Sequence, residues 1–134
     1  MEFKQLVMSR YATKKFDGKT INQEKINELL EMIRYAPSSF NIQPWKIQVI
    51  TDKKIKEQIQ KASWNQEQVT TSSHLLVFCA NKNILENINK LETQMKQAKV
   101  PEQQIQPYIK IMKDFANGMT EKEQVIWAQK QVYL

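Results

Sequence analysis

The sequence predicts an α+β fold that consists mainly of helices together with two core strands. Apolar residues recur at helical spacing along most of the chain, which indicates amphipathic helices. Two short segments instead contain β-branched residues in partial alternation or in a continuous apolar run, as strands do. The length of 134 residues is enough for one domain, residues 1–134, with its own core.

The helices are predicted from their apolar spacing and from local start and stop signals. Asn22 is a suitable N-cap, and Pro37 ends the helix that follows it. On the lysine-rich third helix, we expect Ile55 and Ile59 to face the core. The expected helices cover residues 2–9, 23–35, 53–62, 83–98, 102–117 and 121–134, with a possible short helix at 66–70.

Two strands are expected, at residues 45–51 and 74–80. The second is apolar enough for burial on both faces, so we expect its cysteine, Cys79, to be a buried and inert thiol. Two strands make a stable sheet only when helices or further strands cover them. Because Val132-Tyr133-Leu134 also ends in an apolar run without a C-cap, the chain looks cut short.

Composition narrows the class of protein. Hydrophobic residues make up 41% and charged residues 25%, as in ordinary globular proteins, and no apolar run reaches membrane-spanning length. The start of the chain has no apolar signal region, so we expect a cytoplasmic protein that does not bind membranes. One cysteine and one histidine nearly exclude a zinc site, and we expect no metal.

The net charge of +6 permits anionic ligands or nucleic acid. The lysines are interleaved with glutamates along the whole chain, which is a weak signal for nucleic acid, and we expect no such partner. Only Gly18 and Gly118 are present, so a glycine-rich phosphate loop is excluded. A bound phosphate would have to be held by side-chain cations or by helix N-termini.

Three polar clusters could carry chemistry, and each also has a structural interpretation. Arg10 and Lys14 could clamp a phosphate and an electron-rich ring, or they could belong to a solvated basic loop. Residues 37–45 form a proline-bounded loop that could be a binding site or a helix stop followed by a turn. The amides of Asn65 and Gln68 could read a heterocycle edge or simply form a polar turn.

The order of these clusters is more specific than any one of them. It runs from Arg10-Tyr11-Ala12-Thr13-Lys14 to Pro37-Ser38-Ser39-Phe40-Asn41-Ile42-Gln43-Pro44-Trp45, a strand, Asn65 and an apolar strand. This order resembles the FMN-dependent nitroreductase family, which includes bacterial oxygen-insensitive NAD(P)H nitroreductases and flavin reductases. The resemblance covers about residues 8–80 and returns at residues 127–134, where Gln131-Val132-Tyr133-Leu134 is similar to the family's central helix.

The resemblance implies a mixed sheet wrapped by helices and an intertwined homodimer with FMN at its interface. By resemblance, Arg10 contacts the flavin phosphate, and the backbone of Tyr11 and Ala12 lies close by. Lys14 lies at the pyrimidine edge of the flavin, where its charge stabilises the reduced ring, and Asn65 hydrogen-bonds that edge. Lys14 and Gln68 are also the residues that the resemblance assigns to the substrate or NAD(P)H.

The second cluster is assigned to the partner subunit's flavin. By resemblance, its contacts come from Pro37, Ser38, Ser39 and Asn41. NAD(P)H would pass hydride to the flavin and leave, and a nitroaromatic, a quinone or a related small acceptor would then take the electrons in a ping-pong reaction. Because the cofactor is the reactant, the resemblance implies no catalytic acid–base residue.

Two features depart from the family pattern. Gln68 stands where some relatives carry a second lysine, and family members continue well beyond residue 134. The alternative prediction is therefore a truncated, non-catalytic family member that acts as an interaction module or is an inert remnant. A basic nucleic-acid-binding domain is the third alternative, supported only by the charge.

Overall fold

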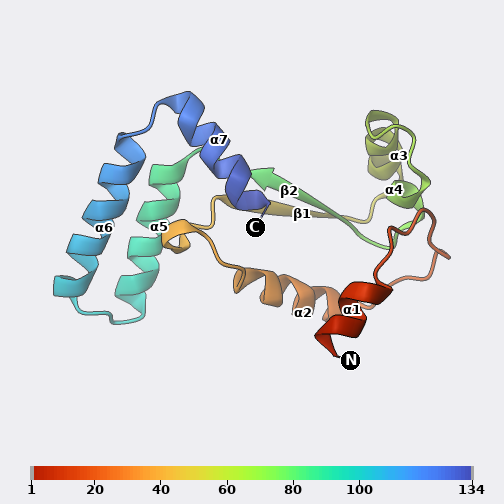
Figure 1. The fold of residues 1–134 in the computed structure, drawn as a ribbon, viewed down its shortest axis with the longest axis horizontal. Coiled ribbons are helices and arrows are strands. Elements are labelled where there is room, and N and C mark those ends of the chain that lie inside the picture. Colours follow the sequence, from red (N-terminus) through yellow and green to blue (C-terminus); the bar gives the residue numbers. More distant parts are fainter. Residues whose placement is uncertain (1, 134) are drawn as a thin grey trace. The chain divides into compact units, whose positions relative to one another are not determined.

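The computed structural model describes residues 2–133 and contains helices with a two-stranded sheet (Figure 1). Leu134, the last residue of the predicted seventh helix, lies outside the described residues. In chain order the elements are α1 (Phe3–Ser9), α2 (Gln23–Arg34), the 3-10 turn η1 (Ser39–Asn41), β1 (Trp45–Ile50), α3 (Lys53–Ala62), α4 (Glu67–Thr71), β2 (Leu75–Ala80), α5 (Ile84–Gln97), α6 (Glu102–Asn117) and α7 (Glu121–Val132). The predicted mainly helical α+β fold is confirmed.

Local capping explains where several helices begin. The backbone N–H of Glu24 donates to the Asn22 side chain over 2.7 Å, which confirms the predicted N-cap of α2. Asp52 accepts in the same way from the N–H of Ile55 at the start of α3. Thr120 and Glu123 form a reciprocal capping box at the start of α7. Each cap pairs N–H groups that have no partner within the helix.

The chain divides into two compact units. The first unit consists of Met1–Ile26 and Val49–Val77, and the second of Asn27–Gln48 and Phe78–Leu134. Strands β1 and β2 pair in antiparallel fashion, and the N–H of Asn81 continues the pairing by donating to the Pro44 carbonyl over 2.7 Å.

The second unit contains the larger core, built around α5 and α6, which lie side by side (Figure 1). Ile84, Ile88, Ile105 and Met112 are at most 1% exposed, so the apolar stripes predicted from helical spacing do face each other. Ile42 of the loop before β1 joins this core, and so the loop is packed against the helices.

The strand β2 does not have the predicted burial. Its first half is half-buried and its second half is exposed, including Cys79 and Phe78, which is 44% exposed. The prediction of a strand buried on both faces and of a buried thiol is therefore wrong. The apolar run makes the strand suitable for burial, but among residues 2–133 its sheet has a single other strand, and little covers its second half.

The helix α3 also differs from its prediction at one of the two positions expected to face the core, since Ile59 is half-buried but Ile55 is exposed. Ile55 is 46% exposed, whereas its neighbour Lys56 is only 6% exposed. The Lys56 ammonium donates to the Ser72 carbonyl over 2.6 Å. A long lysine side chain can be buried in this way because its stem is apolar and its charged end has an oxygen partner.

An acidic residue on α5 links the two core helices, and it makes their stability depend on pH. Glu92 accepts from Lys96 over 2.8 Å and from Lys113 of α6 over 3.4 Å. These bonds, the one from Lys96 first, hold the pKa of Glu92 below its usual value of 4.5. Because the pKa is lowered on folding, this stabilisation is present above pH 4.5 and is lost as the pH falls through the lowered pKa.

We therefore expect the stability of Glu92→Gln to fall less than that of the wild type as the pH is lowered below 4.5. The measurement is the urea midpoint of unfolding between about pH 3 and pH 7. Glu121→Gln is the matched control, since Glu121 forms no ion pair within residues 2–133 and should leave the curve's shape unchanged. Parallel curves for the wild type and Glu92→Gln would contradict the assignment.

Candidate functional site

The first predicted cluster lies in the connector that follows α1. Arg10 is the C-cap residue of α1 and has an extended backbone, with φ −65° and ψ 133°. The side chains of Tyr11, Ala12 and Lys14 are exposed. An extended connector of this kind presents its cations and its backbone N–H groups to the surface, where an anionic ligand could reach them.

Two interactions join this connector to α4 within the first unit. Lys15 pairs with Glu67 over 3.2 Å, and the N–H of Phe16 donates to the Thr71 hydroxyl over 3.1 Å. Both Lys15 and Glu67 are exposed, so the ion pair by itself contributes little to stability. Its significance is positional, because it holds the residues next to Lys14 against the helix that carries Gln68.

The turn that precedes α4 has an unusual backbone. Trp64 and Asn65 both have positive φ, 50° and 56°. Asparagine tolerates this left-handed region better than most residues do, whereas tryptophan seldom adopts it. The turn is held on both sides, since the N–H of Asn65 donates to the Gln60 carbonyl and the Gln60 side chain donates back to the Asn65 carbonyl. The exposed Asn65 side chain is thus held by a fixed backbone.

The second predicted cluster is the loop between α2 and β1, and its backbone is strained. Phe40, Asn41 and Gln43 have φ of 56°, 56° and 48°. Residues other than glycine stay in this region only when the surrounding structure holds them there, and such strain is concentrated at functional sites.

Hydrogen bonds from three helices hold this loop. The N–H of Ser39 donates to the side chain of Gln131 on α7 over 2.7 Å, and the Gln43 side chain donates to the Arg34 carbonyl over 2.7 Å. The Tyr108 hydroxyl of α6 donates to the Phe40 carbonyl over 3.1 Å. The loop conformation is therefore imposed by the second unit as a whole.

The helix α7 supplies a residue that the sequence did not single out for this purpose. Gln131 is only 7% exposed, and the resemblance marked it merely as part of a family-like helix. Gln131 comes three residues after the buried Ala128, so both lie on one face of α7. This spacing is the sequence signal from which the burial of Gln131 could have been predicted. Phe40 of the loop also packs against Phe115 of α6, which packs against Trp127 of α7, with ring centroids 5.3 and 5.6 Å apart.

A surface hollow of about 420 Å³ brings three of the predicted loop residues together. Pro37, Ser38 and Asn41 line it, beside the end of α2 and Gln94 of α5. The structure thus places the candidates in two groups, one in each unit. Arg10, Tyr11, Ala12, Lys14, Asn65 and Gln68 lie in the first unit, and Pro37, Ser38, Ser39 and Asn41 lie in the second.

The described residues offer neither a metal site nor a membrane-spanning helix. Between residues 2 and 133, no group of three or more His, Cys, Asp or Glu side chains could hold a metal ion. None of the helices in the same range combines the length and apolar character needed to span a bilayer.

Nearly all of the chain matches a known protein family. The model of the nitroreductase family matches residues 7–134, which include all three predicted clusters and the helix that anchors the loop. The chain belongs to the nitroreductase family. The resemblance inferred from the order of the motifs is thereby confirmed.

Individual relatives agree with this assignment. A Staphylococcus epidermidis protein provisionally named NAD(P)H nitroreductase is 31% identical over 93% of this chain and 60% of its own length. A nitroreductase-fold structure from Bacillus subtilis has a TM-score of 0.86 at 24% identity and covers 98% of this chain and 64% of that one. An Exiguobacterium sibiricum structure in complex with FMN has a TM-score of 0.79 at 21% identity, with 98% and 68% covered.

The high TM-scores of the solved structures confirm the fold. Because the sequence identities are below 25%, these structures are evidence for the fold alone. The chain spans about 60% of the length of the curated relatives that it matches.

Proposed function

We propose that this chain binds FMN and acts as an NAD(P)H oxidoreductase on nitroaromatics, quinones or related small acceptors. Membership of the nitroreductase family supports the proposal, as do the NAD(P)H nitroreductase names of its relatives and the FMN complex of a protein with the same fold. Use of NAD(P)H would place the protein in a compartment that contains reduced nicotinamide, such as the cytoplasm.

The observation that carries the proposal is the joining of the basic connector to the Asn65 turn. The Lys15–Glu67 pair and the Phe16–Thr71 hydrogen bond hold the segment containing Lys14 beside the helix that follows Asn65. FMN offers a phosphate and a ring edge that alternates donors and acceptors. Two cations, an amide turn and Gln68 within one unit match both features.

Each of these residues has a proposed role. Arg10 holds the phosphate through charge-assisted hydrogen bonds, with the backbone of Tyr11 and Ala12 beside it. Asn65 reads the pyrimidine edge, and Lys14 stabilises negative charge there. Gln68 contributes a neutral amide in place of a second cation and, with Lys14, meets the nicotinamide substrate.

We further propose that Pro37, Ser38, Ser39 and Asn41 contact the flavin of a second copy, in a homodimer. Helix α1 supports an assembly of this kind, because it buries none of its residues although Phe3, Leu6 and Val7 lie on one side. Phe3 is 80% exposed in the single chain, and contact with a second copy would bury it together with Leu6 and Val7.

When bound, FMN would supply the ring that accepts hydride from NAD(P)H and passes electrons to the acceptor. NAD(P)H and the acceptor would occupy the same site one after the other. The chain's own residues then bind, orient and neutralise charge. No acid–base pair is required of them, because the cofactor is the reacting group. Holding the nicotinamide and the ring in contact is the larger part of the protein's contribution.

The test is a visible absorption spectrum of the purified chain after reconstitution with FMN, before and after anaerobic addition of NADPH. We expect protein-bound flavin bands that bleach with NADPH and return when a quinone is added. A chain that cannot retain FMN through gel filtration would contradict the proposal. That result would favour the second candidate, a non-catalytic family member.

A further inference from the structure

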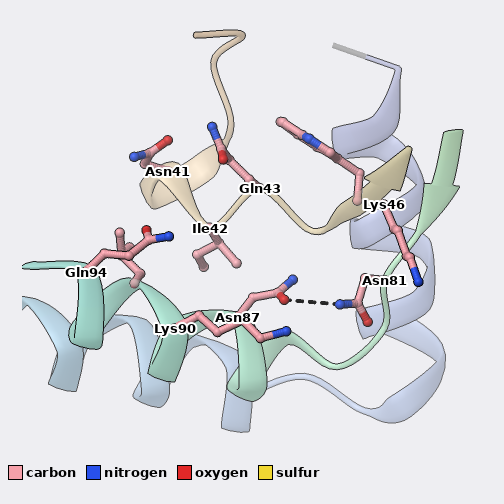
Figure 2. A pocket seen from close by; sticks show the side chains of 10 residues that line it. Asn41, Ile42, Gln43, Lys46, Asn81, Asn87, Lys90 and Gln94 are labelled. Atoms are coloured by element: carbon pink, nitrogen blue, oxygen red, sulfur yellow. Dashed lines mark hydrogen bonds between the residues drawn. The ribbon is translucent and has the colours of Figure 1, made fainter. Parts of the chain in front are cut away.

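A polar pocket lies beside α5, between the loop before β1 and the stretch of α5 from Asn87 to Gln94 (Figure 2). Its volume is about 280 Å³, and every residue that lines it belongs to the second unit. The lining consists of five side-chain amides, two lysines and three apolar or aromatic residues, namely Asn41, Gln43, Asn81, Asn87, Gln94, Lys46, Lys90, Ile42, Leu91 and Trp45.

A chain of hydrogen bonds orients the amides at the base of this pocket. The backbone N–H of Asn83 donates to the Asn81 side-chain oxygen over 3.0 Å. A backbone N–H can only donate, so it fixes which end of the Asn81 amide is oxygen. The Asn81 nitrogen then donates to the Asn87 oxygen over 3.1 Å, shown as the dashed line in Figure 2. This relay leaves the Asn87 nitrogen directed away from Asn81.

The Asn87 nitrogen is a buried donor that needs an acceptor. The Asn87 residue is only 9% exposed, and its Nδ2 has no hydrogen-bond partner among the described residues. In Figure 2 this nitrogen points into the space between α5 and the Gln43–Lys46 segment. Buried amide donors are nearly always paired, because leaving one unpaired costs the hydration that it has lost. An acceptor atom in the pocket beside this nitrogen would satisfy it.

The charges around the pocket indicate what kind of acceptor it is. Two lysines line the pocket, and no aspartate or glutamate does. Lys90 is partly neutralised by Glu86 at 2.6 Å, whereas Lys46 forms no ion pair in the part of the chain that the structure describes. A cation and a buried amide donor in one small cavity favour an anionic oxygen over a neutral one.

We propose that this pocket binds an oxyanion of the phosphate class. Asn87 donates to one oxygen, Lys46 supplies the charge, and Lys90 reaches the rim from α5. Donors that approach from β1 and from α5 suit a tetrahedral group with several acceptor oxygens better than they suit a planar carboxylate. The volume is large enough for a phosphate, either free or as the phosphate of an ester. The assignment does not rest on FMN binding, since Lys46, Asn81 and Asn87 have no role in the proposed flavin contacts.

The first experiment is a titration of the flavin-free chain with inorganic phosphate at constant ionic strength, balanced with chloride. The side-chain amide signals of Asn87 are followed by ¹H–¹⁵N NMR, and the melting temperature is measured in parallel. We expect a saturable shift of the Asn87 amide signals and a rise in the melting temperature. The absence of a saturable shift would overturn the proposal.

Variants separate the pocket from general surface charge. Asn87→Asp keeps the oxygen that accepts from Asn81 but replaces the free donor by an anionic oxygen, so phosphate affinity should fall at least about tenfold. Lys46→Gln should weaken binding similarly, and Lys46→Arg should retain it. Lys54→Gln, an exposed lysine of α3, is the matched control and should bind like the wild type. Equal affinity in Asn87→Asp and Lys46→Gln would contradict the proposal, and Lys46→Gln decides the matter if Asn87→Asp does not fold.

A second titration distinguishes the two sources of the phosphate group. Adenosine monophosphate is compared with adenosine and with inorganic phosphate, using the same Asn87 signals. A site for phosphate esters should prefer the monophosphate, because Trp45 at the pocket wall offers a surface on which a base can stack. A site for free phosphate should prefer the inorganic ion, and binding of adenosine alone would contradict the proposal.

Discussion

Replacing Ile88 by alanine should lower the free energy of unfolding of the second unit by about 2–5 kcal/mol. Ile88 is fully buried and belongs to the cluster in which α5 packs against α6. Alanine removes several methyl and methylene groups, and the close-packed neighbours, Ile84 and Ile105 among them, cannot fill the space completely. The loss therefore includes both the transfer of apolar surface and the cavity that remains.

The matched control is Ile111→Ala on α6, which makes the same chemical change at a position that is 55% exposed. We expect it to change stability by less than about 0.5 kcal/mol. Urea unfolding followed by circular dichroism gives the two values, and hydrogen exchange of the α5 and α6 amides assigns the effect to the second unit. An equal loss in both variants would show that Ile88 is not part of a packed core.

The second large effect is expected at Arg10. Arg10→Ala should weaken FMN binding by about 1.5–3 kcal/mol, or roughly 10- to 150-fold in Kd, since it removes a charge-assisted contact to the phosphate. The fold should be unaffected, because Arg10 is an exposed C-cap residue after a helix that buries nothing. Fluorescence titration of FMN measures the affinity, and circular dichroism monitors the fold.

Two variants test the specificity of that result. Lys4→Ala removes an exposed cation from α1 and should leave flavin affinity unchanged. Arg10→Lys keeps a charge but loses the two-pronged geometry, so its affinity should lie between the wild type and alanine. If Arg10→Ala binds FMN as well as the wild type does, Arg10 belongs to a solvated basic loop and the phosphate is held elsewhere.

The elements themselves were predictable because each one is specified locally. The caps at Asn22 and the helix stop at Pro37 act within a few residues, and the α5 and α6 stripes follow from helical spacing alone. Where several polar clusters occurred in a set order, that order pointed to the family that the comparison then confirmed. For the flavin contacts the sequence offers residue types and order, and their roles stay predictions.

Burial was less predictable, since it depends on what other parts of the chain place against a residue. The apolar composition of β2 indicated a buried strand, yet the structure leaves Cys79 exposed, because covering a strand requires neighbours that its own residues do not specify. The same reason explains Lys56. Its burial follows from the position of the Ser72 carbonyl, sixteen residues away, and not from any apolar stripe on α3.

By itself, the sequence determined the mainly helical α+β fold, the positions of the elements and the family, because caps, spacing and motif order are properties of short segments. Only the tertiary structure decided that the loop at residues 37–45 is held in a strained form by Gln131 and Tyr108, which lie far from it in the sequence. It also decided that the Asn87 side-chain nitrogen has no hydrogen-bond partner among residues 2–133, in a pocket that Lys46 also lines. These features depend on residues that are distant in the sequence. Whether a donor or acceptor finds a hydrogen-bond partner is decided only when the fold has placed both atoms.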